Sequence, residues 1–253
     1  MRLLAISSLL ALCALGRPSM ASAKDQGELI VAAAADLAFA FEEIGKEFSD
    51  STGCRVVFSF GSTGMLASQV ANGAPFDVFA AADIKFIEEL SGLLVEDSQQ
   101  LYAQGRIVVA VNKKTGVVPL SLSDLLNPAF AKIAIANPAH APYGRAAQQA
   151  LQAAGLWEAL RPRIVYGENV RQTLQFIQAG NAGGGIVALS VAHVPEIAYA
   201  LVPDSLHAPL DQAIAILRTT RQEPAARAFI DYLNGPQGRP IMKKYGFLLP
   251  GEF

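Results

Sequence analysis

The sequence predicts an α/β protein folded into two lobes, and three observations support this prediction. Short apolar runs alternate with segments of helical periodicity along most of the chain. The chain has 253 residues, of which 52% are apolar, enough for one large domain or two small ones. No Gly/Ser-rich linker interrupts the middle, which indicates two compact lobes joined by continuous strands.

In the first half of the chain, strands and helices are expected in alternation. Strands are predicted at Leu29–Ala33, Val56–Phe60, Val78–Ala80 and Ile107–Val111. Helices are predicted at Leu37–Ser51, Thr63–Ala71 and Ile84–Leu90. The first helix has one apolar face running from Phe41 to Phe48, and Gly53 marks its end.

The second half shows the same alternation. Strands are predicted at Ile133–Ala136, Ile164–Tyr166, Gly185–Val187 and Ile214–Leu217. Helices are predicted at Gly144–Ala154, Val170–Ala179 and Pro224–Leu233, with a last helix ending near Tyr245. If the chain leaves the first lobe near 108 and returns near 215, lobe one comprises 24–108 plus 215–253 and lobe two comprises 109–214. A ligand then lies in the crevice at the carboxyl ends of the strands.

Residues 1–23 are typical of a secretory signal peptide. Arg2 supplies a positive charge, Leu3–Leu15 is apolar, and Ala21-Ser22-Ala23 is a small-x-small cleavage site. The alternative, a membrane anchor, is disfavoured because the apolar stretch is shorter than the roughly 20 residues that span a bilayer. We therefore expect a periplasmic protein cleaved after Ala23. Its remaining cysteine, Cys54, is expected to be a small buried apolar residue rather than a reactive thiol.

Charge argues against nucleic acid as a partner. Without Arg2 and Arg17 the chain has 18 basic and 22 acidic residues, a net charge of −4. It contains neither a basic run nor basic residues interleaved with aromatic ones. A negative protein can still bind an anion, because local N–H groups determine the affinity.

Two strand-to-helix junctions, Val31–Leu37 and Phe58–Gly64, have the composition of an anion site. Each apolar run ends in small or hydroxyl residues just before a helical pattern. A helix that begins there presents free N–H groups and the positive end of its dipole. Two such ends facing one cleft bind an oxyanion without lysine or arginine. The alternative for Ser62, Thr63 and Gly64 is a simple turn with a capping threonine.

Several motifs occur in a recognisable order. They are Ala-Ala-Ala-x-Leu at Ala33–Leu37, Gly73–Phe79 followed by Ala82-Asp83, Asn137–Gly144, Glu168–Arg171, Gly185–Val187, Gly235–Gln237 and Lys244–Phe247. With these motifs the chain resembles the periplasmic molybdate-binding proteins of ABC importers, which belong to the type II solute-binding proteins. The resemblance extends over nearly the whole chain after the signal peptide.

The resemblance implies a type II periplasmic-binding-protein fold, with a mixed sheet flanked by helices in each lobe and the ligand in the cleft between the lobes. It implies a monomeric receptor, not an enzyme, that binds molybdate or tungstate with N–H groups and hydroxyls and delivers it to a permease and an ATPase. No cofactor is implied, and no metal beyond that of the oxyanion. Carried over by position, the ligand-binding residues are Asp36, Ser62, Thr63, Tyr143, Val170 and Ala188.

Two of these positions depart from the family pattern. Many members have serine at the position of Asp36 and tyrosine at that of Ala188, so two hydroxyl donors are missing. Tyr143 or Tyr166 is a candidate to replace one of them. Asp36 has an alternative role as a helix N-cap. An ionised Asp36 about 4 Å from a dianion would be repelled by roughly 8 kcal/mol at an effective dielectric near 20.

Three explanations for Asp36 therefore remain open. The carboxylate points away from the ligand, where Arg145 or Arg171 could pair with it, or it is protonated and donates a hydrogen bond. Otherwise the cleft binds a different solute, such as a neutral or protonated oxyacid, a cation or a small organic molecule. Two further classes are a secreted enzyme and a sensory receptor. The enzyme is disfavoured because the sequence has no Gly-x-Ser-x-Gly elbow and its three histidines show no metal-binding spacing.

Overall fold

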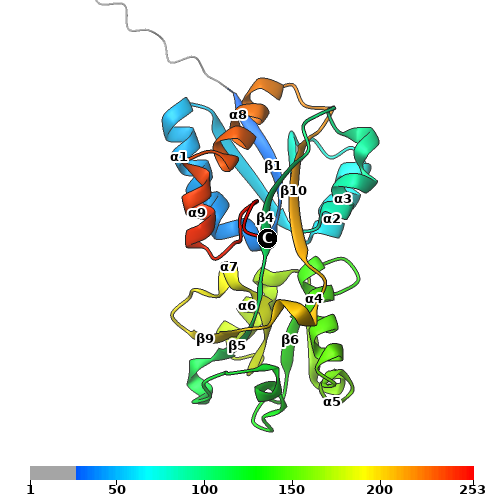
Figure 1. Cartoon of the computed structure of the whole chain (residues 1–253), viewed down its shortest axis with the longest axis vertical. Helices are drawn as coiled ribbons and strands as arrows, with labels where there is room; N and C mark the ends of the chain where they lie inside the picture. The colour runs from blue at the N-terminus through cyan, green and yellow to red at the C-terminus, as the bar shows by residue number, and fades with distance from the viewer. Residues whose placement is uncertain (1–26) are drawn as a thin grey trace, which may run out of the picture.

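The computed structural model describes residues 27–253. The predicted signal peptide at 1–23 lies outside this range. The described chain forms two lobes stacked along the long axis of the molecule, each built on its own five-stranded sheet (Figure 1). The predicted two-lobed α/β architecture is confirmed.

Lobe one contains a mixed sheet in the order β2-β1-β3-β10-β4. Its first three strands are parallel, while β10 is antiparallel to both β3 and β4. The strands are β1 (Glu28–Ala34), β2 (Arg55–Gly61), β3 (Val78–Ala81), β4 (Gln100–Gly105) and β10 (Leu210–Ile216). Because β1, β2 and β3 are parallel, their carboxyl ends meet at one edge of the sheet, where it faces lobe two.

Lobe two repeats this plan in the order β7-β6-β8-β5-β9. Strand β6 is parallel to β7 and β8, and β5 is antiparallel to β8 and β9. The strands are β5 (Ile107–Asn112), β6 (Ile133–Ala136), β7 (Ile164–Gly167), β8 (Gly184–Ala188) and β9 (Ile197–Leu201). Both sheets are therefore mixed, with one antiparallel strand inserted among parallel ones.

Helices flank both sheets (Figure 1). Those of lobe one are α1 (Ala38–Thr52), α2 (Thr63–Ala71), α3 (Ile84–Glu89), α8 (Glu223–Asn234) and α9 (Gly238–Lys244). Those of lobe two are α4 (Pro142–Ala153), α5 (Trp157–Leu160), α6 (Val170–Gln178) and α7 (Leu189–Ala192). Short 3-10 turns are η1 (Ala35–Leu37), η2 (Ser91–Leu93), η3 (Lys113–Thr115), η4 (Leu122–Leu126), η5 (Arg161–Arg163) and η6 (Asp204–Leu206). None of the helices in residues 27–253 has the length and apolar character needed to cross a membrane.

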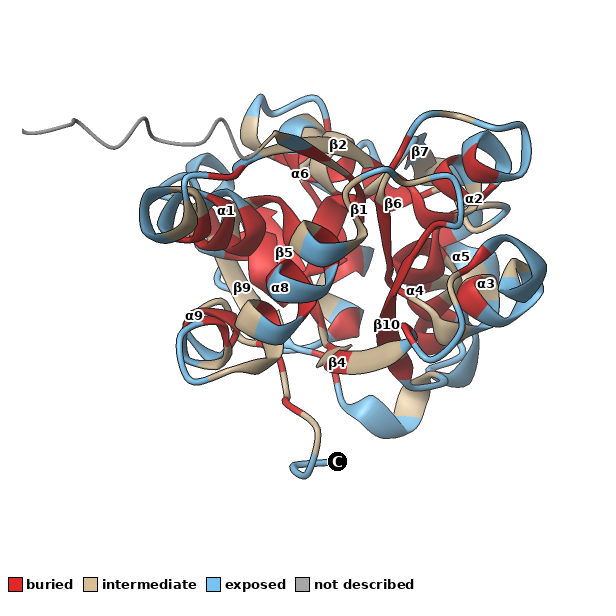
Figure 2. Cartoon of the chain, turned by 90° about the horizontal axis from the view of Figure 1, so that it is seen from above, coloured by how far each residue is buried: buried red, intermediate tan, exposed pale blue. Residues whose placement is uncertain are grey.

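The helices cover the sheets with the faces that the sequence indicates. In α1 the buried residues include Phe41, Ile44 and Phe48, and Gly53 caps the helix in the left-handed conformation at φ 77°. Figure 2 shows that burial is concentrated in the strands and in the helix faces turned toward them. Cys54 is buried in this core, and burial raises the pKa of its thiol, as expected of a structural cysteine.

The chain crosses between the lobes twice. The first crossing is at Arg106, between β4 and β5, and the second lies within residues 202–209, between β9 and β10. The sheets thus divide the chain a few residues before the predicted boundaries, because Ile107 and Val108 already pair in lobe two, and 210–214 pair in lobe one. Strands β4 and β9 were not among the predicted elements; β4 contains two glutamines, and β9 is an edge strand with half-exposed residues.

Candidate functional site

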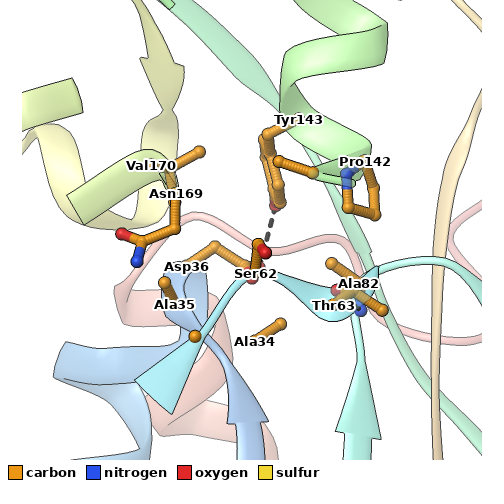
Figure 3. A pocket seen from close by; sticks show the side chains of 12 residues that line it. Ala34, Ala35, Asp36, Ser62, Thr63, Ala82, Pro142, Tyr143, Asn169 and Val170 are labelled. Carbon is orange, nitrogen blue, oxygen red and sulfur yellow. Dashed lines mark hydrogen bonds between the residues drawn. The ribbon is translucent and has the colours of Figure 1, made fainter. Parts of the chain in front are cut away.

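A cavity lies between the lobes, at the carboxyl ends of the strands. It has an empty volume of about 200 Å³, counting the part open to solvent. Lobe one contributes the ends of β1 and β2 and the helix starts that follow them, and lobe two contributes the starts of α4 and α6 (Figure 3). Among the described residues that line it, none is lysine or arginine. An anion bound here would therefore contact main-chain dipoles and hydroxyl groups.

Three α-helices begin at the cavity, and each presents an early N–H group. Thr63 is the first residue of α2 and Val170 the first of α6. At the start of α4, Pro142 has no N–H, so the first helical N–H is that of Tyr143. Such groups have no partner within their own helix. Free N–H groups at helix starts are suited to an anion. Of the two predicted strand-to-helix junctions, Phe58–Gly64 leads into one of these helices, α2, whereas Val31–Leu37 ends in the 3-10 turn η1.

The cap of α6 leaves the N–H of Val170 available. Asn169 precedes it, and its side-chain oxygen accepts hydrogen bonds from the N–H groups of Arg171 and Gln172, at 3.0 and 3.1 Å. The cap thus takes the second and third N–H groups of the helix and bypasses the first. Val170 lies at the cavity and is buried.

Two hydroxyls lie beside these N–H groups. Thr63 Oγ1 accepts a hydrogen bond from Ala82 N–H at 3.1 Å, so its own proton remains free to be donated. Ser62 Oγ lies 2.8 Å from His140 Nδ1, across the interlobe boundary. The side chains of Ser62 and Thr63 do not cap α2, so the simple capped turn considered for them is wrong.

Asp36 is the only carboxyl residue among the described residues that line the cavity, and its side chain lies in a buried polar network. Its Oδ2 accepts hydrogen bonds from Tyr143 Oη at 3.0 Å and from Gln212 Nε2 at 2.7 Å (Figure 3 shows the first). Gln212 Nε2 also donates to Tyr143 Oη at 2.9 Å, and Tyr102 Oη donates to Gln212 Oε1 at 2.8 Å. All four side chains are buried. The network joins β4, β10 and η1 of lobe one to α4 of lobe two.

The structure excludes two of the roles considered for Asp36, that of a helix cap and that of a partner to an arginine. Asp36 is not a helix cap, because the residue before α1 is Leu37 and no side chain caps that helix. Nor is it paired with arginine: Arg145 binds Asp83 at 2.7 Å, and Arg171 lies 3.8 Å from Glu42. With only neutral donors nearby, burial raises the pKa of the Asp36 carboxyl from 3.8 to about 6.

The structure brings five of the six predicted site residues to one cavity: Asp36, Ser62, Thr63, Tyr143 and Val170. Ala188 is buried at the end of β8, where it pairs with Ile107, and does not line the cavity. Neither candidate for the missing hydroxyls replaces them. Tyr143 Oη donates to Asp36, and Tyr166 lies on edge strand β7, 46% exposed and outside the cavity.

Sequence reasoning missed Gln212, Tyr102 and Ser190. Ser190 Oγ, in α7, donates to the main-chain oxygen of Asp36 at 2.8 Å and so ties lobe two to η1. Gln212 is fully buried in β10, a strand predicted to begin only at Ile214. A polar residue within the apolar run from Leu210 to Ile216 was the available signal, since buried polar side chains are usually hydrogen-bonded.

The Ser62–His140 pair also has the composition of a hydrolase dyad, so its surroundings matter. No carboxylate hydrogen bonds to the His140 ring within residues 27–253, so the group that would orient the imidazole is missing. The same described range contains no cluster of three or more His, Cys, Asp or Glu residues placed to hold a metal ion.

Two lobes that enclose a cavity lined by helix starts define a solute receptor of the periplasmic-binding-protein type. The chain belongs to the bacterial extracellular solute-binding proteins, whose family model matches residues 29–248.

Its relatives carry a more specific name. It is 40% identical to the molybdate-binding protein ModA of Azotobacter vinelandii, over 92% of this chain and 95% of that protein. It is 36% identical to ModA of Rhodobacter capsulatus, over 88% of each chain. A solved structure of the periplasmic molybdate-binding protein of Azotobacter vinelandii superposes with a TM-score of 0.82 and 33% identity, covering 88% of this chain and 99% of that chain.

Proposed function

We propose that this protein is the periplasmic receptor of an ABC importer and that it binds molybdate or tungstate between its lobes. The observation that carries the proposal is the convergence of helix-start N–H groups on a cavity without cationic side chains. The names of the relatives support this choice of oxyanion. Asp36, Ser62, Thr63, Tyr143 and Val170 are the proposed binding residues.

Binding follows from fixed dipoles and lobe closure. N–H groups that are already aimed at the cavity need no reorganisation, and closure removes water and strengthens each hydrogen bond. Selectivity arises from cavity size and from the number of donors. A smaller oxyanion such as sulfate leaves some donors unpaired, which costs about 1–3 kcal/mol for each buried group. The closed receptor then passes the anion to a membrane permease and its ATPase, and we expect it to act as a monomer.

Calorimetric titration of the protein without residues 1–23 tests this function. Molybdate and tungstate at about pH 7 are expected to bind with affinities much higher than those of sulfate and phosphate. Val170→Pro sharpens the test, because proline at the first helical position keeps the helix but removes the N–H donor. Loss of one hydrogen bond to a charged ligand costs about 1.5–3 kcal/mol, so affinity is expected to fall about 10–100-fold.

Ile84→Pro is the matched control. It also places proline at the first position of a helix, α3, after an extended N-cap residue, and Ile84 does not line the cavity. It is expected to leave molybdate affinity unchanged. The proposed function is wrong if none of the four anions binds the native protein, and the proposed role of Val170 is wrong if both proline variants bind equally well.

Closure is testable through Gly64, which meets lobe two directly. Its N–H donates to His140 O at 2.9 Å, and a Cβ added there would lie 2.8 Å from the same oxygen. Gly64→Ala therefore obstructs the closed arrangement while favouring the helix by up to about 1 kcal/mol. We expect about tenfold weaker molybdate binding with no loss of thermal stability.

Gly92→Ala serves as the control for Gly64→Ala. An added Cβ at Gly92 meets nothing within 4 Å. It is expected to bind molybdate as the native protein does. Equal affinities of the two alanine variants, measured by the same titration, would show that the Gly64–His140 contact plays no part in closure.

A further inference from the structure

The feature that the proposed function leaves unexplained is an acid in an anion site. Asp36 lines the cavity and is 1% exposed, and the side chains within residues 27–253 that donate hydrogen bonds to its carboxyl are the neutral ones of Tyr143 and Gln212, beside its own main-chain N–H. Both side-chain hydrogen bonds end on Oδ2. No side chain among the described residues donates to Oδ1, so Oδ1 is the oxygen of this carboxyl on which we place a proton.

Within residues 27–253, no charged side chain forms a hydrogen bond or an ion pair with the carboxyl of Asp36. Titratable residues in its own network are Tyr102 and Tyr143, and burial raises the pKa of both phenols well above the usual value, so both stay neutral. On the neighbouring elements, charged residues have partners of their own, and α2 and α7 carry no charge. The charged residues on the other neighbouring elements form the pairs Glu42 with Arg171, Glu43 with Lys244, Arg145 with Asp83, and Asp211 with Gln104.

We infer that the closed complex holds one proton together with the oxyanion, carried on Asp36 Oδ1 and donated to a ligand oxygen. This inference rests on the proposed function, since it concerns the same cavity. Asp36 then acts as a hydrogen-bond donor, in place of the serine hydroxyl that many members of the resembled family carry at this position. A charged carboxylate at the same place would repel the anion.

The proton balance is simple. A fully deprotonated dianion brings no proton, so binding takes one from the solvent: one O–H bond forms on Asp36, one O–H or N–H bond breaks in the buffer acid, and no other bond changes. The pKa of the carboxyl, already raised to about 6 by burial, supports this step, because a neighbouring dianion raises it further. Hydrogen phosphate differs, since it carries a proton of its own and needs none from the buffer.

Asp36 thereby determines how many protons are taken up with each kind of oxyanion. An ionised Asp36 accepts a hydrogen bond from a protonated oxyanion, and a protonated Asp36 donates one to a deprotonated oxyanion. In either case the closed cavity contains one proton, shared between Asp36 and the bound oxyanion. The number of protons taken from solvent therefore differs between molybdate and hydrogen phosphate even where both bind.

Calorimetric titration with molybdate in buffers of different ionisation enthalpy measures this number. At about pH 7.5 we expect uptake close to one proton per molybdate, and at about pH 5 much less, because free Asp36 is then already protonated. Affinity is expected to fall about tenfold per pH unit above the carboxyl pKa of the free protein. Asp36→Asn is expected to abolish both the proton uptake and the pH dependence of binding.

Asp50→Asn is the matched control, because Asp50 is an exposed carboxylate on α1 beside Lys46. It is expected to retain the uptake of the native protein. Molybdate binding without proton uptake at about pH 7.5, or uptake that persists in Asp36→Asn, would overturn the inference and leave the proposed function standing. Absence of molybdate binding at every pH would overturn the proposed function itself. If Asp36→Asn does not fold, the proton uptake of the native protein in the buffer series still tests the inference.

Discussion

Replacing Gln212 by leucine is expected to lower the free energy of unfolding by about 3 kcal/mol. Gln212 is fully buried, and its amide joins Asp36, Tyr143 and Tyr102. Leucine fills a similar volume but leaves the carboxyl of Asp36 with one hydrogen bond fewer in a dry site. For a chain of this size the melting temperature should fall by about 6–12 °C, measured by differential scanning calorimetry.

Gln104→Leu is the matched control for Gln212→Leu. Gln104 lies on β4, next to β10, and its half-buried amide donates a single hydrogen bond to Asp211 at 2.8 Å. Its loss is expected to cost about 1 kcal/mol or less. If both leucine variants melted at the same temperature, the network around Asp36 would contribute no particular stability.

The second large effect is the pH dependence of stability that Asp36 imposes. Its pKa is about 6 in the folded protein, against 3.8 for an unperturbed aspartate. Between these values the folded state binds more protons than the unfolded state, so this group makes the free energy of unfolding fall as pH rises. The full contribution is present below about pH 4 and is lost by about pH 7, a change of about 3 kcal/mol.

Asp36→Asn removes this contribution and isolates it. The stability of the variant relative to the native protein is expected to improve by about 3 kcal/mol between about pH 4 and pH 7, measured by denaturant unfolding without ligand. Other carboxyl groups cancel in the difference. Asp50→Asn leaves the buried carboxyl in place, so it should keep the pH dependence of the native protein. A variant-minus-native difference that is constant with pH would mean that Asp36 is not desolvated in the folded protein.

Most of the fold was predictable because its signals are local. The face from Phe41 to Phe48, the glycine that ends α1 and the apolar runs of β1, β2, β3 and β5 all appear in short windows of sequence. Strands β4 and β9 were not predicted, because their residues are held in strands by neighbouring elements rather than indicated by an apolar run in the sequence. Gln100 and Gln104 suit β4 because the end of α8 and strand β10 supply partners for them.

The site was predictable in the same sense. Ser62 and Thr63 follow a strand, Tyr143 follows a proline, and Val170 follows a capping asparagine, so each helix start was visible from a few adjacent residues. Ala188 was placed in the site by position in the family, and the structure leaves it outside the cavity. The helix that follows Ala188, α7, instead contacts Asp36 through Ser190.

The sequence alone determined that two strand-to-helix junctions are rich in small and hydroxyl residues, which predicts an anion receptor, because caps and helix starts depend on neighbours along the chain. Only the tertiary structure decided what Asp36 does. Its partners Tyr143 and Gln212 lie 107 and 176 positions away, and they meet it because two lobes close and an antiparallel strand returns beside β3. The charge of a buried carboxyl depends on the groups packed around it, and those are brought together only by the fold.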